Sequence, residues 1–113
     1  MVQAYVEKLT ELIRQTASDK HRDVRLEIKH FFSGAAVYAN GAICITLTPA
    51  GLALKLPEYH RTTLLQKHGA TPLRYFPKAP IKKEYVVLPT SIIDDRTALR
   101  RWIAESIDYA AGS

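Results

Sequence analysis

The chain has 113 residues, of which 47% are hydrophobic and 24% charged, ordinary values for a folded domain that argue against a disordered or fibrous protein. Its single cysteine, Cys44, cannot form an intramolecular disulfide, and no apolar run approaches the ~18 residues that span a bilayer. Since no secretion leader is apparent either, the sequence predicts a cytoplasmic protein in which residues 1–113 form one domain.

The net charge of +5 is concentrated in one part of the chain. Residues 55–83 contain seven basic residues and one acidic residue, whereas the segment before them is almost neutral and the segment after them is acidic. A basic excess favours partners that carry negative charge. Whether these cations share one surface depends on the fold.

The first predicted element is an amphipathic helix over residues 2–17. Its apolar side chains recur at spacings of three and four, which places them on one helical face. They are Val2, Val6, Leu9, Leu12, Ile13 and Thr16 or Ala17. After a polar loop, residues 24–29 alternate between apolar and charged side chains, a pattern that predicts a half-buried strand. The apolar series is Val24, Leu26 and Ile28, and the charged series is Arg25, Glu27 and Lys29.

Residues 29–48 form the centre of the predicted sheet. They contain two apolar strands joined at Asn40-Gly41, a dipeptide that suits a type I′ turn because both of its positions need φ > 0. Gly34 interrupts the first strand, and a glycine there marks a bulge, a bend or the close approach of another backbone. A turn at Pro49-Ala50-Gly51 leads into residues 52–56, the third strand of a meander.

The second half of the chain is predicted to contain two helices and two strands. Pro57 introduces a helix over residues 58–68 that ends at Gly69. Short strands at 73–76 and 84–88 flank a basic, proline-rich loop, which should be exposed. The final helix begins at Asp94 or Asp95 and carries an apolar stripe at helical spacing. The stripe consists of Leu99, Trp102, Ile103, Ser106, Ile107 and Ala110.

This order of elements, α-β-β-β-α-β-β-α, predicts an α+β domain of two layers. Strands joined by tight turns pair antiparallel, so we expect an antiparallel sheet of about five strands with the helices packed on one face. If the opposite face exposes Val37, Ile43 or Ile45 as a patch, that patch is a candidate surface for a protein partner or for a homodimer.

No catalytic or metal-binding constellation is apparent. The histidines, His21, His30, His60 and His68, include no pair at helical spacing, and a zinc site needs three or four converging ligands. Cys44 lies in an apolar strand, where a small core residue is a simpler interpretation than a nucleophile. Because the carboxylates belong to separate elements as well, the sequence predicts no enzyme activity, no metal and no cofactor.

The basic loop is the best candidate site. Arg74, Lys78, Lys82 and Lys83 lie in or beside it, where they would contact phosphates or other anions while the adjacent aromatic rings stack on bases. The alternative interpretation is a solvated loop without a ligand, because charge runs are commonly only solvated. The same alternative applies to the basic pair at 100–101.

Four segments follow one another in the order and spacing of a known family. Residues 29–38, Lys-His-Phe-Phe-Ser-Gly-Ala-Ala-Val-Tyr, are similar to a motif Arg-x-Met-Phe-Gly-Gly-x-Gly-[Ile/Leu]-Tyr, with Ser33 and Ala36 at two of its glycines. Residues 52–56, 69–75 and 85–103 are similar to three further family patterns. In these segments the chain resembles, from about residue 24 to 110, the N-terminal domain of the TfoX/Sxy competence regulators.

The resemblance implies a non-enzymatic regulatory or protein-interaction module linked to competence gene transcription in bacteria. A protein partner in transcriptional regulation is therefore expected, and direct nucleic-acid binding through the basic hairpin over residues 74–83 is the alternative. The full-length regulators carry a second, C-terminal helical domain, for which 113 residues leave no room. The resemblance thus implies a stand-alone single-domain member.

Overall fold

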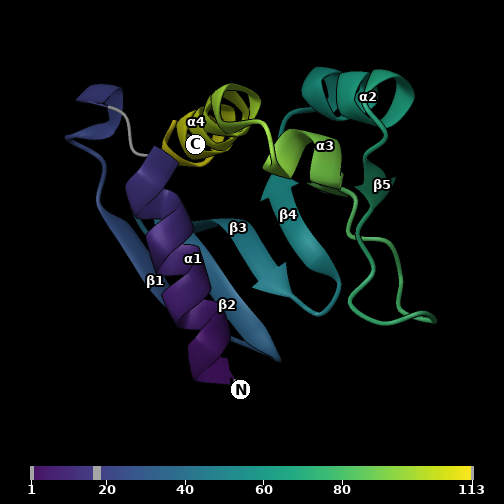
Figure 1. The fold of residues 1–113 in the computed structure, drawn as a ribbon, viewed down its shortest axis with the longest axis horizontal. Coiled ribbons are helices and arrows are strands. Elements are labelled where there is room, and N and C mark those ends of the chain that lie inside the picture. The colour runs from purple at the N-terminus through teal and green to yellow at the C-terminus, as the bar shows by residue number, and fades with distance from the viewer. Residues whose placement is uncertain (1, 17–18, 113) are drawn as a thin grey trace.

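The computed structural model describes residues 2–16 and 19–112, in which a six-stranded antiparallel sheet carries the helices on one face (Figure 1). The helices are α1 (Val2–Thr16), α2 (Glu58–Lys67), α3 (Thr90–Ile93) and α4 (Arg96–Ala111), with a 3-10 turn η1 (Asp19–His21). The strands are β1 (Leu26–Phe31), β2 (Gly34–Ala39), β3 (Ala42–Thr48), β4 (Gly51–Lys55), β5 (Thr71–Pro72) and β6 (Tyr85–Val87), in the order β1-β2-β3-β4-β6-β5. The predicted α+β architecture is confirmed.

The details of the sheet differ from the prediction in two places. A turn at Phe32-Ser33 separates β1 from β2, so that four strands precede α2 and the sheet has six strands where about five were expected. Residues 73–76 do not form a strand. They belong to a loop in which the Leu73 side chain is fully buried and the Leu73 carbonyl accepts a hydrogen bond from the Lys82 amide at 2.9 Å. The strand that pairs with the outer side of β6 is instead β5, which consists of Thr71–Pro72.

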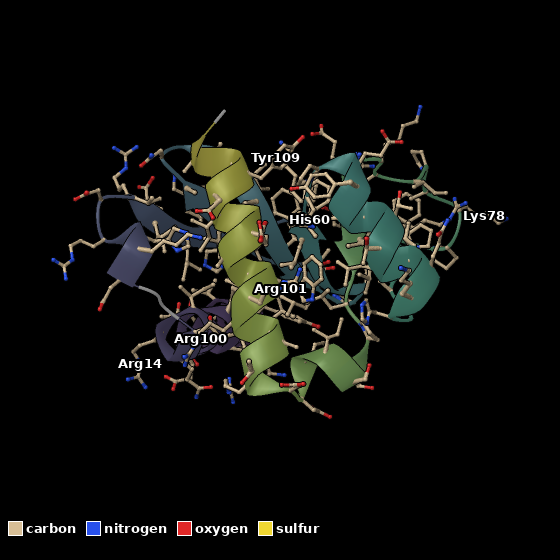
Figure 2. The ribbon with its side chains drawn as sticks, turned by 90° about the horizontal axis from the view of Figure 1, so that it is seen from above. Arg14, His60, Lys78, Arg100, Arg101 and Tyr109 are labelled. Atoms are coloured by element: carbon tan, nitrogen blue, oxygen red, sulfur yellow. The ribbon has the colours of Figure 1, made fainter. Side chains whose placement is uncertain are left out.

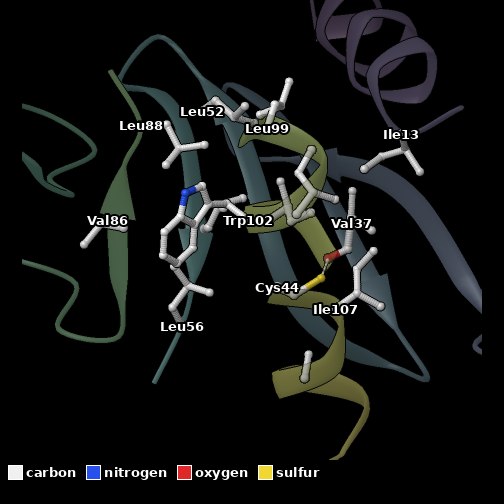
Figure 3. Close-up of a cluster of buried hydrophobic side chains, with 14 of the residues drawn as sticks. Ile13, Val37, Cys44, Leu52, Leu56, Val86, Leu88, Leu99, Trp102 and Ile107 are labelled. Atoms are coloured by element: carbon white, nitrogen blue, oxygen red, sulfur yellow. Dashed lines mark hydrogen bonds between the residues drawn. The ribbon is translucent and has the colours of Figure 1, made fainter. Parts of the chain in front are cut away.

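The core lies between the sheet and the helices α1 and α4 (Figure 3). The predicted stripe of α4 is buried in full, and α1 contributes Leu9 and Ile13 from its apolar face. The expectation for Ala17 and for the side chain of Val2 falls outside the described residues. None of the described helices is long and apolar enough to cross a membrane.

One tight turn and one close approach between backbones explain the positions of two glycines. Asn40 and Gly41 have φ values of 51° and 86°, which confirms the predicted turn with two left-handed positions. At Gly34 a Cβ atom would lie 2.0 Å from the carbonyl oxygen of Leu47. Of the three explanations for this glycine, the close approach of another backbone is therefore the one that the structure shows.

A β-bulge in β3 joins the sheet to the last helix. Val37 pairs with Ile45 and Tyr38 with Ile43, which leaves Cys44 as the extra residue of β3. The Ser106 hydroxyl of α4 lies 3.0 Å from the carbonyl oxygen of Cys44 and 2.9 Å from that of Lys55. The hydroxyl has a single proton and donates it to one of these carbonyls at a time, so it ties α4 to the sheet through either β3 or β4.

Replacing Gly34 by alanine should destabilise the domain strongly. The added methyl would overlap the backbone of β3. Because β2 and β3 cannot move apart without breaking their backbone pairing, we expect a loss of at least about 3 kcal/mol in the free energy of unfolding. Urea unfolding followed by circular dichroism measures this. The control is Ser33→Ala in the adjacent exposed turn, which should change stability little; equal stabilities of both variants would contradict the close approach.

Candidate interaction surface

The predicted apolar patch on the helix-free face does not exist as expected. Val37 and Ile45 are fully buried and face the helices, so neither can contact a partner. Ile43 is half-buried and lies on the opposite face, because the bulge at Cys44 breaks the alternation that would otherwise place Ile43 and Ile45 on one side. The prediction is thus wrong for two of its three residues.

The centre of the helix-free face is covered. Ala36, Thr46 and Ala53 are neighbours in the sheet register on this face, and all three are fully buried. Burial raises the pKa of Tyr75 in the β5–β6 loop, and an interaction with the Thr46 hydroxyl opposes the rise. That contact is weak, since the Thr46 oxygen makes no hydrogen bond of normal geometry among the described residues. The β5–β6 loop therefore lies against this face of the sheet.

The four predicted basic residues are all exposed on the β5–β6 loop. The Arg74 guanidinium donates to the Ala79 carbonyl at 2.6 Å, which holds the loop in a defined shape. The Lys83 carbonyl accepts a hydrogen bond from Arg61 of α2, and this bond fixes the far end of the loop. Lys78 and Lys83 form no ion pair among residues 2–16 and 19–112. The structure thus presents these cations on an ordered loop.

The wider basic segment does not form one surface. Arg61 donates to the Leu56 carbonyl at 2.9 Å, and Lys55 approaches Glu84 to 4.0 Å, so both are engaged within the fold. Figure 2 shows Lys78 on the outer side of its loop, well apart from Arg100 and Arg101 on α4. Within residues 55–83, the cations at 74, 78, 82 and 83 are therefore grouped on the β5–β6 loop, apart from Lys55 and Arg61.

An aromatic cluster lies beside this loop, and it adds Phe31 and Phe32 to the rings expected from the sequence. The rings of Phe31 and Phe32 are 4.6 Å apart, and both lie within 5.8 Å of the Tyr75 ring. Phe32 is 79% exposed and Phe76 is 61% exposed, which is unusual for phenylalanine. The Lys82 ammonium lies 5.9 Å from the centre of the Tyr75 ring and joins the two groups.

Phe32 also has a strained backbone. Its φ of +49° places it in the left-handed region, which bulky residues rarely occupy and which costs about 1–3 kcal/mol. Because the Phe32 side chain is mostly exposed, no core packing compensates for this cost. We call the combined feature the aromatic–basic surface. It consists of Phe31, Phe32, Tyr75 and Phe76 with Arg74, Lys78, Lys82 and Lys83.

Cys44 and His60, two groups that could in principle act in catalysis, lie in surroundings typical of structural residues. Burial raises the pKa of the Cys44 thiol to about 12, so that it is protonated at neutral pH and a poor nucleophile. His60 of α2 lies on the side of that helix that faces α4 (Figure 2). Its Nε2 is 3.3 Å from a Glu105 carboxylate oxygen, and its ring is edge-on to that of Trp102. Within the described part of the chain, no three His, Cys, Asp or Glu residues are placed to hold a metal ion.

A second histidine joins distant parts of the chain. His21 of η1 is buried, and its Nε2 lies 2.7 Å from Asp108 Oδ1 near the end of α4, while Lys20 Nζ lies 2.8 Å from Asp108 Oδ2. Burial raises the pKa of Asp108, but hydrogen bonds from Lys20 and His21 outweigh this effect and hold the pKa below its usual value. The cluster ties η1 to α4.

An open groove lies beside α1. It measures about 770 Å³ and is bounded by α1, β3, β4 and α3, with Leu12, Leu47 and Ile93 on its apolar walls. Its charged groups, Glu7, Lys8 and Glu11, all come from α1, so no groups from different elements converge on a common point. This geometry gives no indication of acid–base chemistry.

Comparison with known proteins gives one match. The sequence model of the TfoX N-terminal domain matches residues 23–110. Searches of curated proteins and of solved structures found no match. The matched range begins just before β1 and ends within α4, so it contains the whole sheet and all of the aromatic–basic surface.

The Asp108 cluster should make stability depend on pH in the acid range. Because the folded pKa is lowered, its contribution is complete above the unfolded pKa of about 3.9 and is lost as the pH falls through the folded pKa. Asp108→Asn should therefore lower the free energy of unfolding at neutral pH and much less at acid pH. Urea unfolding at both pH values measures this, with exposed Asp23→Asn as control; an equal loss at both would contradict the assignment.

Proposed function

Because the chain belongs to the TfoX N-terminal domain family, we propose that it is a non-enzymatic regulatory module that acts by binding another protein. The proposed setting is transcriptional regulation of competence genes in the bacterial cytoplasm. The domain contributes recognition, and its partner contributes any activity on DNA.

The observation that carries this proposal is the exposed, strained Phe32. A side chain that is costly in its backbone conformation and unprotected from water is expected where a partner covers it. Phe31 and Tyr75 support the ring from the side, so it projects from a stiff base. Aromatic anchors of this kind commonly dominate the binding energy of protein interfaces.

The charges around the anchor define the chemistry of the partner. Arg74, Lys78 and Lys82 are exposed next to the aromatic rings, and the described structure gives the lysines no carboxylate partner. An interface is most specific when opposite potentials meet across it. The partner should therefore present an apolar pocket for Phe32 with acidic residues at its rim.

Phe32→Asn should abolish partner binding without loss of stability. Asparagine tolerates left-handed backbone, so the variant removes the ring and keeps the turn. The control is Tyr59→Gln, which removes another exposed aromatic ring, from α2 on a different part of the surface. Both variants and the wild type are immobilised, exposed to a nuclease-treated bacterial lysate, and the retained proteins are identified by mass spectrometry.

We expect a protein that the wild type and Tyr59→Gln retain and Phe32→Asn loses, and whose retention falls when an acidic rim residue of that protein is neutralised. Equal retention by all three baits would contradict a role for the aromatic–basic surface. Retention seen only in a parallel lysate that has not been treated with nuclease would favour the second candidate function instead.

The second candidate function is direct binding of nucleic acid through the same loop. Four exposed cations beside aromatic rings favour it, because cations neutralise phosphates and rings stack on bases. In this case the wild type should bind labelled DNA with a dissociation constant of about 10⁻⁴ to 10⁻⁶ M that weakens steeply with salt. Fluorescence anisotropy with duplex and single-stranded DNA measures this.

The variant Lys78→Glu, Lys82→Glu, Lys83→Glu should then lose binding. A matched control, Arg22→Glu, Arg96→Glu, Arg100→Glu, changes the net charge by the same amount at exposed positions elsewhere. Equal losses in both would show that only total charge matters, and no binding by the wild type at low salt would contradict this second function.

A further inference from the structure

β1 forms one border of the sheet, and among the described residues no further strand pairs with its outer side (Figure 1). Unpaired edge strands are templates for pairing with another chain unless something blocks them. The opposite border is blocked, because β5 contains only Thr71 and Pro72 and proline has no amide hydrogen to donate. β1 is six residues long and contains neither proline nor glycine, so it is the open edge.

The hydrogen bonds to β2 show which backbone groups of β1 point outward. The Asn40 amide donates to the Arg25 carbonyl at 2.8 Å, so the backbone of residue 25 faces β2. In an antiparallel ladder this orientation alternates along the strand. The backbone groups of Leu26, Ile28 and His30 therefore face away from the sheet, where a second strand would find them.

We propose that two copies of the chain associate through β1, paired antiparallel with Ile28 opposite Ile28 of the second copy. A twofold axis through the middle of the shared edge keeps the helices of both copies on one side of a continuous sheet. In this register the outward backbone groups of Ile28 meet those of the second Ile28, and Leu26 meets His30. All three outward-facing residues of the strand are then paired.

The charges of β1 select this register. On the helix-free face, Glu27 lies opposite Lys29 of the second copy, and Lys29 lies opposite its Glu27, so two opposite-charge pairs form. Both side chains are accessible: Lys29 is exposed, and 40% of the Glu27 side chain is exposed. A partner strand of identical sequence thus supplies the complementary charges.

Neighbouring registers are unfavourable. A shift of the twofold axis to residue 27 would place the two Glu27 side chains opposite each other, and a shift to residue 29 would do the same with the two Lys29 side chains. Like charges directly opposite one another destabilise a strand pair. Axes at Leu26 or His30 leave at most three residue pairs within the strand, so the register at Ile28 combines length with charge complementarity.

Charge reversal tests the proposal without touching the core. Glu27→Lys and Lys29→Glu each turn two attractive pairs into two repulsive pairs, so each variant alone should dimerise about tenfold or more weakly than the wild type. The double variant Glu27→Lys, Lys29→Glu restores two attractive pairs and should dimerise like the wild type. An equal mixture of the two single variants should form a heterodimer, because every pair across its interface is then attractive.

Sedimentation equilibrium over a wide range of concentration measures each dissociation constant, and circular dichroism confirms that each variant is folded. A second measurement follows the amide hydrogens of Leu26, Ile28 and His30, which should exchange more slowly with solvent as the concentration rises. A wild type that stays monomeric at the highest concentration would overturn the proposal. Dimers that tolerate both single reversals, or that protect other amides, would overturn it as well.

Discussion

The attachment of α4 to the bulge in β3 is the constraint on which the rest of the structure depends. Ser106 is fully buried, and its hydroxyl reaches carbonyls of two neighbouring strands. A buried hydroxyl without such acceptors would be destabilising by about 1–3 kcal/mol, so the helix is held at one position along the sheet. The bulge in turn decides that Ile45 enters the core while Ile43 faces the other way. The two layers and the character of the helix-free face follow from this one junction.

Local patterns were enough to predict the elements and most of the core. Alternation over residues 24–29 located β1, the Asn40-Gly41 turn located the central hairpin, and the spacing from Leu99 to Ala110 identified the buried face of α4. Each of these signals is contained in fewer than about twenty consecutive residues, which is the range over which helix and strand periodicity operates. The exposure of the loop cations was also predicted correctly, because a loop rich in proline and lysine is expected at the surface.

Long-range contacts account for what the sequence did not reveal. The bulge at Cys44 depends on a helix more than sixty residues later in the chain, and period-two counting alone places Ile43 with Ile45. The aromatic–basic surface brings Phe31 and Phe32 next to Tyr75, and the cluster at Asp108 brings in His21 across 87 residues. No composition or spacing rule connects such positions. The basic loop with its adjacent aromatic rings was a local sign of one half of this surface, and the Phe-Phe pair at 31–32 carried no signal that it would lie beside them.

The two borders of the sheet are unequal, and this limits how the protein assembles. A sheet with two usable edges adds copies without end and produces fibrils, as cross-β assemblies do. Here the short β5 with Pro72 prevents a further strand from pairing at one border. When the strand that adds to β1 belongs to a second copy, both outer borders of the joined sheet are β5 strands. Because both borders are then blocked, no third copy can add in this way. The fold has a built-in stop against polymerisation.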